Sequence, residues 1–99
     1  MTSDDAASMP LRAVVTICNE RGLHARASAK FVKLAEGFDA MIEVTKDDMT
    51  VGGTSIMGLM ALGAGPGSEI EITTRGNQAE EALAAILRLV ERGFDEEKA

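Results

Sequence analysis

The chain has 99 residues, enough for one domain with a modest core, and a net charge of −6. This acidic balance argues against nucleic-acid binding, which needs a basic surface, and the lack of Tyr and Trp removes the usual base-stacking side chains. Because 45% of the residues are hydrophobic and only three are aromatic, we expect an aliphatic, methionine-rich core.

Cys18 is the only cysteine, so no internal disulfide or cysteine-based metal cluster can form. We expect this side chain to pack as a small apolar group near the end of a strand. Residues 1–10 are polar and predict a flexible N-terminal tail rather than a signal peptide. No stretch approaches the roughly 18 consecutive apolar residues of a membrane span. We therefore expect a cytoplasmic protein that has no membrane partner.

The first half of the chain predicts a strand, a helix and a hairpin. Apolar and polar residues alternate over residues 11–18, which is typical of a strand. The spacing becomes helical over residues 25–36, and Gly37 is a natural end for that helix. Residues 41–45 and 49–51 alternate again on either side of a polar turn, which predicts a β-hairpin.

The second half predicts a short helix, a strand and a long helix. Ser55 is a suitable N-cap for an apolar helical segment at residues 56–62, and residues 69–74 form a fourth alternating strand. Asn77 and the glutamate three residues later resemble a capping box at the start of the last helix. Gly93 is expected to close that helix.

The predicted order is therefore β-α-β-β-α-β-α. Every strand has one polar or mixed face, which favours an antiparallel sheet covered on one side. The sequence predicts an α+β fold, a two-layer open-faced sandwich in which three helices cover one face of a four-stranded antiparallel sheet. We assign residues 11–94 to this domain and residues 95–99 to an acidic C-terminal tail.

Residues 22–26, Gly-Leu-His-Ala-Arg, hold the only histidine of the chain at the predicted start of a helix. The first amides of a helix lack intrahelical partners and carry partial positive charge, so an imidazole there could hold a phosphoryl group whose oxygens those amides bind. Spacing alone leaves two interpretations of His24 open. It is either an ordinary surface or half-buried histidine or a phosphoryl acceptor.

Basic residues gather around this stretch. The sequence places Arg21, Arg26, Lys30 and Lys33 within thirteen positions, and no acidic residue lies among them. In an acidic protein this pattern indicates either a solvated helix face or a site for a small anion or an acidic partner.

Two motifs resemble the HPr family, the histidine-containing phosphocarrier proteins of the bacterial phosphotransferase system. They are GLHAR at residues 22–26 and SIMGLMALG at residues 55–63, and the element order from residue 11 to residue 94 also matches. Family members accept a phosphoryl group on histidine Nδ1 from a phosphohistidine of Enzyme I, which phosphoenolpyruvate charges. They pass it to a histidine of an Enzyme IIA protein. Sugar transport and its regulation are the processes that this resemblance implies.

The resemblance implies a role for each matching residue of the first motif. His24 would accept the phosphoryl group and Arg26 would neutralise its charge. The backbone amides of Ala25, Arg26 and Ala27 would bind the phosphate oxygens. Near pH 7 an imidazole is largely neutral, so a ring nitrogen has a lone pair for the attack.

The second motif implies regulation and docking. Ser55 stands where a subset of the family is phosphorylated by the ATP-dependent HPr kinase/phosphorylase, although a capping serine needs no modification. The Met57 and Met60 side chains belong either to the core or to an exposed recognition surface. The partner-docking residues that we expect are Ile56, Met57, Met60, Lys30 and Lys33.

A different function stays open at this point, namely a non-phosphorylated interaction module that docks through Ile56, Met57 and Met60. In either case we expect a monomer that needs no cofactor or metal, because one histidine without a cysteine cluster leaves too few ligands. Nor does the sequence predict an enzyme, since it contains no nucleotide-binding loop.

Two features depart from the usual family pattern. Ala27 stands where proline usually follows the arginine, which restores one backbone donor in the first helical turn. The GFD stretches at residues 37–39 and 93–95 and the acidic C-terminus are similar to the nitrogen-related regulatory branch. The Ser55 motif is instead similar to the serine-regulated carbohydrate branch. Both traits in one chain favour a regulatory relay.

Overall fold

The computed structural model describes residues 9–96. Its helices and strands, in chain order, are β1 (Leu11–Thr16), α2 (Ala25–Ala35), β2 (Met41–Lys46), β3 (Met49–Gly52), α3 (Ile56–Ala61), β4 (Glu69–Arg75), α4 (Ala79–Glu91) and the 3-10 turn η1 (Gly93–Asp95). The predicted order is confirmed, and each predicted helix and strand lies within two residues of its expected bounds.

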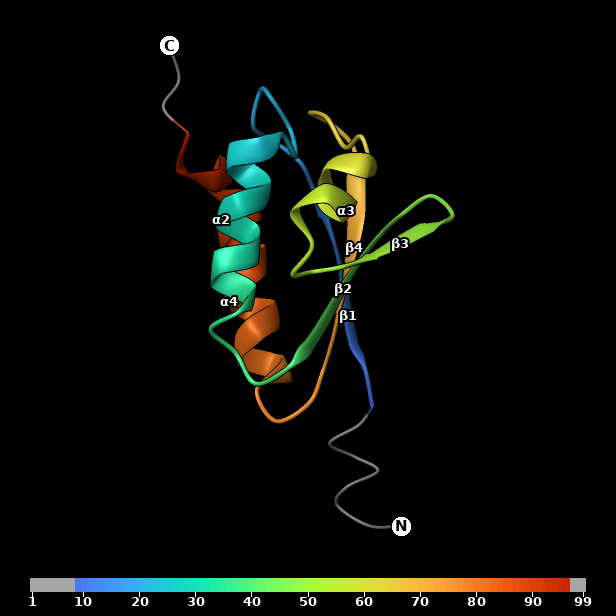
Figure 1. Cartoon of the computed structure of the whole chain (residues 1–99), viewed down its shortest axis with the longest axis vertical. Coiled ribbons are helices and arrows are strands. Elements are labelled where there is room, and N and C mark those ends of the chain that lie inside the picture. The colour runs from blue at the N-terminus through green and yellow to red at the C-terminus, as the bar shows by residue number, and fades with distance from the viewer. Residues whose placement is uncertain (1–8, 97–99) are drawn as a thin grey trace.

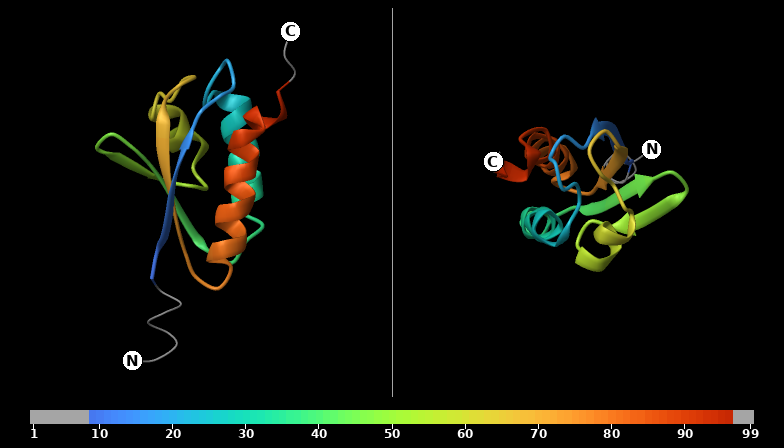
Figure 2. Two further views of the ribbon diagram at one scale, coloured as in Figure 1. Left: turned by 180° about the vertical axis from the view of Figure 1, so that it is seen from behind. Right: turned by 90° about the horizontal axis from the view of Figure 1, so that it is seen from above.

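The four strands form one antiparallel sheet in the order β1-β4-β2-β3. Strand β4 pairs with β1 from Leu11↔Thr74 to Thr16↔Glu69, and on its other side with β2. Helices α2, α3 and α4 lie on the same side of the sheet (Figures 1 and 2), so the predicted two-layer architecture is confirmed. The opposite face is open, and Val14 of β1 is exposed on it.

Branched aliphatic residues and two phenylalanines fill the core between the sheet and the helices. Phe31 of α2 and Phe94 of η1 are fully buried there, together with Ile17, Val44 and Ile72. The prediction of a methionine-rich core is wrong. Every methionine within residues 9–96 is exposed, namely Met9, Met41, Met49, Met57 and Met60.

Two local predictions also need correction. Strand β1 ends at Thr16, and Cys18, which lies beyond the strand, is exposed rather than packed as a small apolar group; its Sγ donates to the backbone oxygen of Val90 at 3.4 Å. Asn77 does not cap α4. Its side-chain amide donates instead to a carboxylate oxygen of Asp39 at 2.9 Å, and the N-cap position is Gln78.

Within residues 9–96, no helix is long and apolar enough to cross a membrane. The same part of the chain contains no cluster of three or more His, Cys, Asp or Glu side chains suited to a metal ion. The predicted N-terminal tail begins outside the described residues, and so does the end of the predicted C-terminal tail, residues 97–99.

Candidate functional site

His24 occupies the N-cap of α2, with extended backbone angles (φ −75°, ψ −178°). The loop before it is tied to the segment after α3, because the Leu23 amide donates to the Ala64 carbonyl at 2.9 Å. Gly22 has φ +62°, and a Cβ there would clash with that same carbonyl. Only glycine therefore fits at this position, and its close approach to Ala64 fixes where His24 lies.

The start of α2 is open. The His24 side chain does not cap the helix, and the first turn contains no acidic residue. The first intrahelical bond runs from the Ser28 amide to the His24 carbonyl at 2.9 Å, which leaves the amides of Ala25, Arg26 and Ala27 without intrahelical acceptors. The Arg26 side chain is exposed beside them. Together these groups form an electropositive corner suited to an anion.

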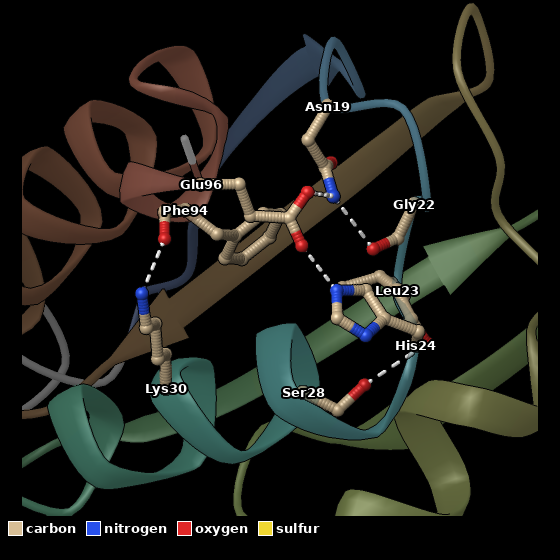
Figure 3. Close-up of polar contacts among 8 residues, drawn as sticks. All are labelled: Asn19, Gly22, Leu23, His24, Ser28, Lys30, Phe94 and Glu96. Carbon is tan, nitrogen blue, oxygen red and sulfur yellow. Dashed lines mark hydrogen bonds and ion pairs between the residues drawn. The ribbon is translucent and has the colours of Figure 1, made fainter. Parts of the chain in front are cut away.

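A carboxylate from the far end of the sequence reaches the imidazole. Nε2 of His24 pairs with Oε2 of Glu96, and the side-chain amide of Asn19 donates to the other carboxylate oxygen at 3.0 Å (Figure 3). The same Asn19 nitrogen donates to the Gly22 carbonyl at 2.9 Å. The second ring nitrogen, Nδ1, faces away from Glu96.

The environment of Glu96 favours its charged form. The hydrogen bond from Asn19, with help from His24 and from the positive charge of Arg21, holds the pKa of the Glu96 carboxyl below its ordinary value, although partial burial acts in the opposite direction. Glu96 was not among the predicted site residues and belonged to the predicted C-terminal tail. The one sequence feature that pointed to a chain folding back there is a phenylalanine directly after the helix-ending Gly93, in an otherwise polar stretch.

The C-terminal turn, residues 93–96, holds Glu96 in place. Gly93, Phe94 and Asp95 all have left-handed angles (φ 66°, 57° and 58°), which are uncommon for the two non-glycine residues. Phe94 anchors the turn because its side chain is fully buried, and the Lys30 ammonium donates to its carbonyl at 2.7 Å. Lys30 therefore joins α2 to the turn.

His24 and Arg26 lie on one hollow in the surface, where basic and acidic groups mix. Its lining includes the predicted basic residues Arg21, Arg26 and Lys30, but also Glu20, Glu91, Asp95 and Glu96. Arg92 and Asp95 form an ion pair at 2.9 Å at its edge. The basic stretch seen in the sequence is therefore partly neutralised in space by the C-terminal turn.

Comparison with known proteins agrees with this geometry. The family model described as "PTS HPr component phosphorylation site" matches residues 11–92. The phosphocarrier protein HPr of Neisseria meningitidis is 45% identical over 86 residues, which are 87% of this chain and 97% of that protein. The chain belongs to the HPr family.

Relatives named HPr and relatives named NPr are both similar to this chain. The phosphocarrier protein NPr of Escherichia coli is 39% identical and covers 90% of this chain and 100% of its own length. A crystal structure of HPr from Thermoanaerobacter tengcongensis superposes with a TM-score of 0.84 at 40% identity, covering 89% of this chain and 99% of that one. The fold is therefore that of solved HPr proteins.

The second HPr motif forms an apolar surface on α3, which lies beside α2 (Figure 1). Met57 is 79% exposed, and Ile56 and Met60 are each 40% exposed, so these side chains are not core residues. Ser55 is the N-cap of α3, and its exposed Oγ accepts from the Gly58 amide at 2.9 Å. Lys33 is exposed on α2.

Proposed function

We propose that this chain is a phosphocarrier whose His24 accepts a phosphoryl group from phospho-Enzyme I and passes it to a histidine of an Enzyme IIA protein. The support is the position of His24 at the open start of α2, in a chain that belongs to the HPr family. Its ring is partly accessible, since 23% of the side chain is exposed. A partner's active site can therefore approach it.

Each transfer exchanges one nitrogen–phosphorus bond for another. As Nδ1 of His24 bonds to phosphorus, the bond to the donor histidine breaks and its electron pair returns to the donor ring. The amides of Ala25, Arg26 and Ala27, with the Arg26 guanidinium, would bind the phosphoryl oxygens. Only moderate binding suits a carrier, because a tightly held phosphoryl group could not be handed on.

The docking surface in this proposal is formed by Ile56, Met57 and Met60 of α3, together with the basic residues Lys30 and Lys33 of α2. Flexible methionine side chains suit a surface that meets more than one partner. The chain would act as a monomer in the cytoplasm and would be a carrier rather than an enzyme, because the partners' active sites charge and discharge it.

Ser55 is the proposed regulatory site for an HPr kinase/phosphorylase. Its exposed Oγ already accepts from a backbone amide, so its hydroxyl proton is not needed for capping. A phosphate there would add about two negative charges next to the apolar docking surface.

Intact-mass spectrometry after incubation with phosphoenolpyruvate and Enzyme I tests the carrier role. We expect a gain of one phosphate that is lost in acid and absent in His24→Ala. Ser55→Ala is the matched control and should still gain the phosphate, because His24 and not Ser55 is the acceptor in this reaction.

Absence of any phosphate gain would favour the second function, a non-phosphorylated interaction module. If the wild-type chain binds Enzyme I but gains no phosphate, it docks through Ile56, Met57 and Met60 without transfer. Its exposed apolar surface on α3 is the one observation that supports this second function.

A further inference from the structure

Glu96 is the only side chain within residues 9–96 that forms a hydrogen bond with the imidazole of His24. The two residues are 72 positions apart in the sequence, and 20% of the Glu96 side chain is exposed. Contact is made at Nε2, whereas Nδ1 lies on the other side of the ring and faces away from the carboxylate (Figure 3).

Several independent contacts hold this carboxylate. The Asn19 amide binds Oε1, and the Glu96 backbone amide donates to the Gly93 carbonyl at 3.1 Å. The turn itself is anchored by buried Phe94 and by the Lys30 ammonium on its carbonyl. Uncommon backbone angles persist only where such surroundings enforce them, and they concentrate at functional sites. Together these contacts hold the Glu96 carboxylate against the imidazole of His24.

We propose that Glu96 is a positioning residue for His24, which holds the ring proton on Nε2 and so leaves the lone pair on Nδ1. A carboxylate can only accept a hydrogen bond, so its partner ring nitrogen must carry the proton. The other nitrogen of a neutral imidazole is then the nucleophile. The part of this inference that concerns transfer rests on the proposed function, but the part that concerns the tautomer does not.

This arrangement also suits the charge change during transfer. When Nδ1 bonds to phosphorus, the ring keeps the proton on Nε2 and becomes a cation, while the donor ring takes back the electron pair of its broken bond. No proton moves in this step. Glu96 stabilises the cation from the Nε2 side, while the amides and Arg26 bind the phosphoryl oxygens on the other side. In the reverse direction His24 leaves as a neutral imidazole.

The first test uses the unphosphorylated, 15N-labelled protein without any partner. Long-range proton–nitrogen correlation spectra above pH 8 report the tautomer of the His24 ring. We expect the wild type to hold the proton on Nε2, and Glu96→Ala to show a larger share of the Nδ1–H form. Glu96→Gln keeps a single acceptor oxygen for which Asn19 and His24 compete, so we expect a share of the Nδ1–H form between those of the wild type and Glu96→Ala.

Glu91→Ala is the matched control, since Glu91 is an exposed glutamate on the same hollow. It should leave the tautomer unchanged. A wild type with its proton on Nδ1, or a Glu96→Ala spectrum identical to that of the wild type, would overturn the proposal. Amide proton–nitrogen spectra would show that each variant keeps the fold.

The second test measures the initial rate of phosphoryl acceptance from phospho-Enzyme I. Glu96→Gln removes the negative charge beside the imidazole, so we expect it to accept about fivefold more slowly than the Glu91→Gln control, the size expected for a partly exposed ion pair. Glu96→Ala should be slower still. Equal rates in all variants would overturn the role in transfer and leave the carrier function intact. If the wild type gains no phosphate, the carrier function fails, and the tautomer spectra alone decide the role of Glu96.

Discussion

The first turns of α2 and α4 differ in charge, although both helices cover the same face of the sheet. Neither helix has a side-chain hydrogen bond from its N-cap residue. The first turn of α4 contains Glu80 and Glu81, and the backbone amide of Gln78 donates to the backbone carbonyl of Asp39 at 2.9 Å. The first turn of α2 contains no acidic residue, and Arg26 is exposed on it.

This difference in charge makes the start of α4 purely structural, whereas the start of α2 is suited to bind an anion. Acidic residues in the first turn offset the positive end of a helix dipole, so α4 is neutralised at its start by its own side chains. At α2 the carboxylate of Glu96 pairs with the imidazole of the N-cap residue rather than with the helix amides. The positive end of α2 is therefore left for a group that arrives from outside.

Reversing the charge at the start of α2 should have the largest effect. Arg26→Glu would place an acid in the first turn, as in α4. We expect phosphoryl acceptance to fall about 100-fold, because a cation that binds the phosphoryl oxygens is replaced by an anion that repels them. Stopped-flow or quench measurements with phospho-Enzyme I would report the rate. Arg88→Glu is the same charge reversal at an exposed residue of α4 and should have little effect on the rate. An equal loss of rate in both variants would contradict a local role of Arg26.

A negative charge at the start of α3 should have the next largest effect. We expect Ser55→Asp to bind Enzyme I about tenfold more weakly in calorimetry, because the charge lies beside the apolar docking residues. Aspartate is itself a good N-cap, so α3 should stay folded. Ser55→Ala removes the cap without adding charge and should bind nearly as the wild type does. Equal affinities of Ser55→Asp and the wild type would contradict the regulatory role.

The carboxylate beside α2 offers a test that depends on pH. Asn19→Ala should raise the pKa of the Glu96 carboxyl towards its ordinary value of 4.5, because it removes the largest cause of the lowering, and Arg21→Gln should raise it less. Titration of the carboxyl carbon by NMR measures both. Because the pKa is lowered in the folded chain, the stabilisation exists above the pKa of the unfolded state and is lost as the pH falls through the folded value. An unchanged pKa in Asn19→Ala would refute this account.

Removing one amide from the start of α2 should have the smallest effect. Ala27 is buried in the first turn, and its N–H is one of the three without an intrahelical acceptor. We expect Ala27→Pro to hydrolyse its phosphohistidine about twofold faster, because one donor to the phosphoryl group is lost. Urea denaturation would show that the variant stays folded. Identical hydrolysis rates would remove any functional meaning from the alanine at this position.

Local patterns predicted the elements and the position of His24 well. Alternation over residues 11–18 and helical spacing from Ala25 onwards depend on which residues face the core, and each of these patterns can be read within a short window. His24 was expected at the start of a helix, and it occupies the N-cap position of α2, although its side chain makes no capping hydrogen bond. The Asn77 prediction failed because a loop residue distant in sequence, Asp39, competes for its side chain.

The pairing of Glu96 with His24 could not be predicted in this way. It depends on three successive left-handed residues, on the burial of Phe94 and on Asn19 from a different loop. None of these has a period or a motif in the sequence. The exposure of Cys18 is similar, because only the folded sheet shows that β1 ends at Thr16 and that Cys18 lies beyond it.

The C-terminal turn has a practical consequence for anyone who handles this protein. The beginning of β1 and the turn lie at opposite ends of the molecule (Figure 1). An affinity tag or a fluorescent fusion joined shortly after Glu96 would therefore begin close to the His24 imidazole, which the Glu96 carboxylate contacts, and would shield His24 from other proteins. A fusion at the N-terminus leaves that approach clear.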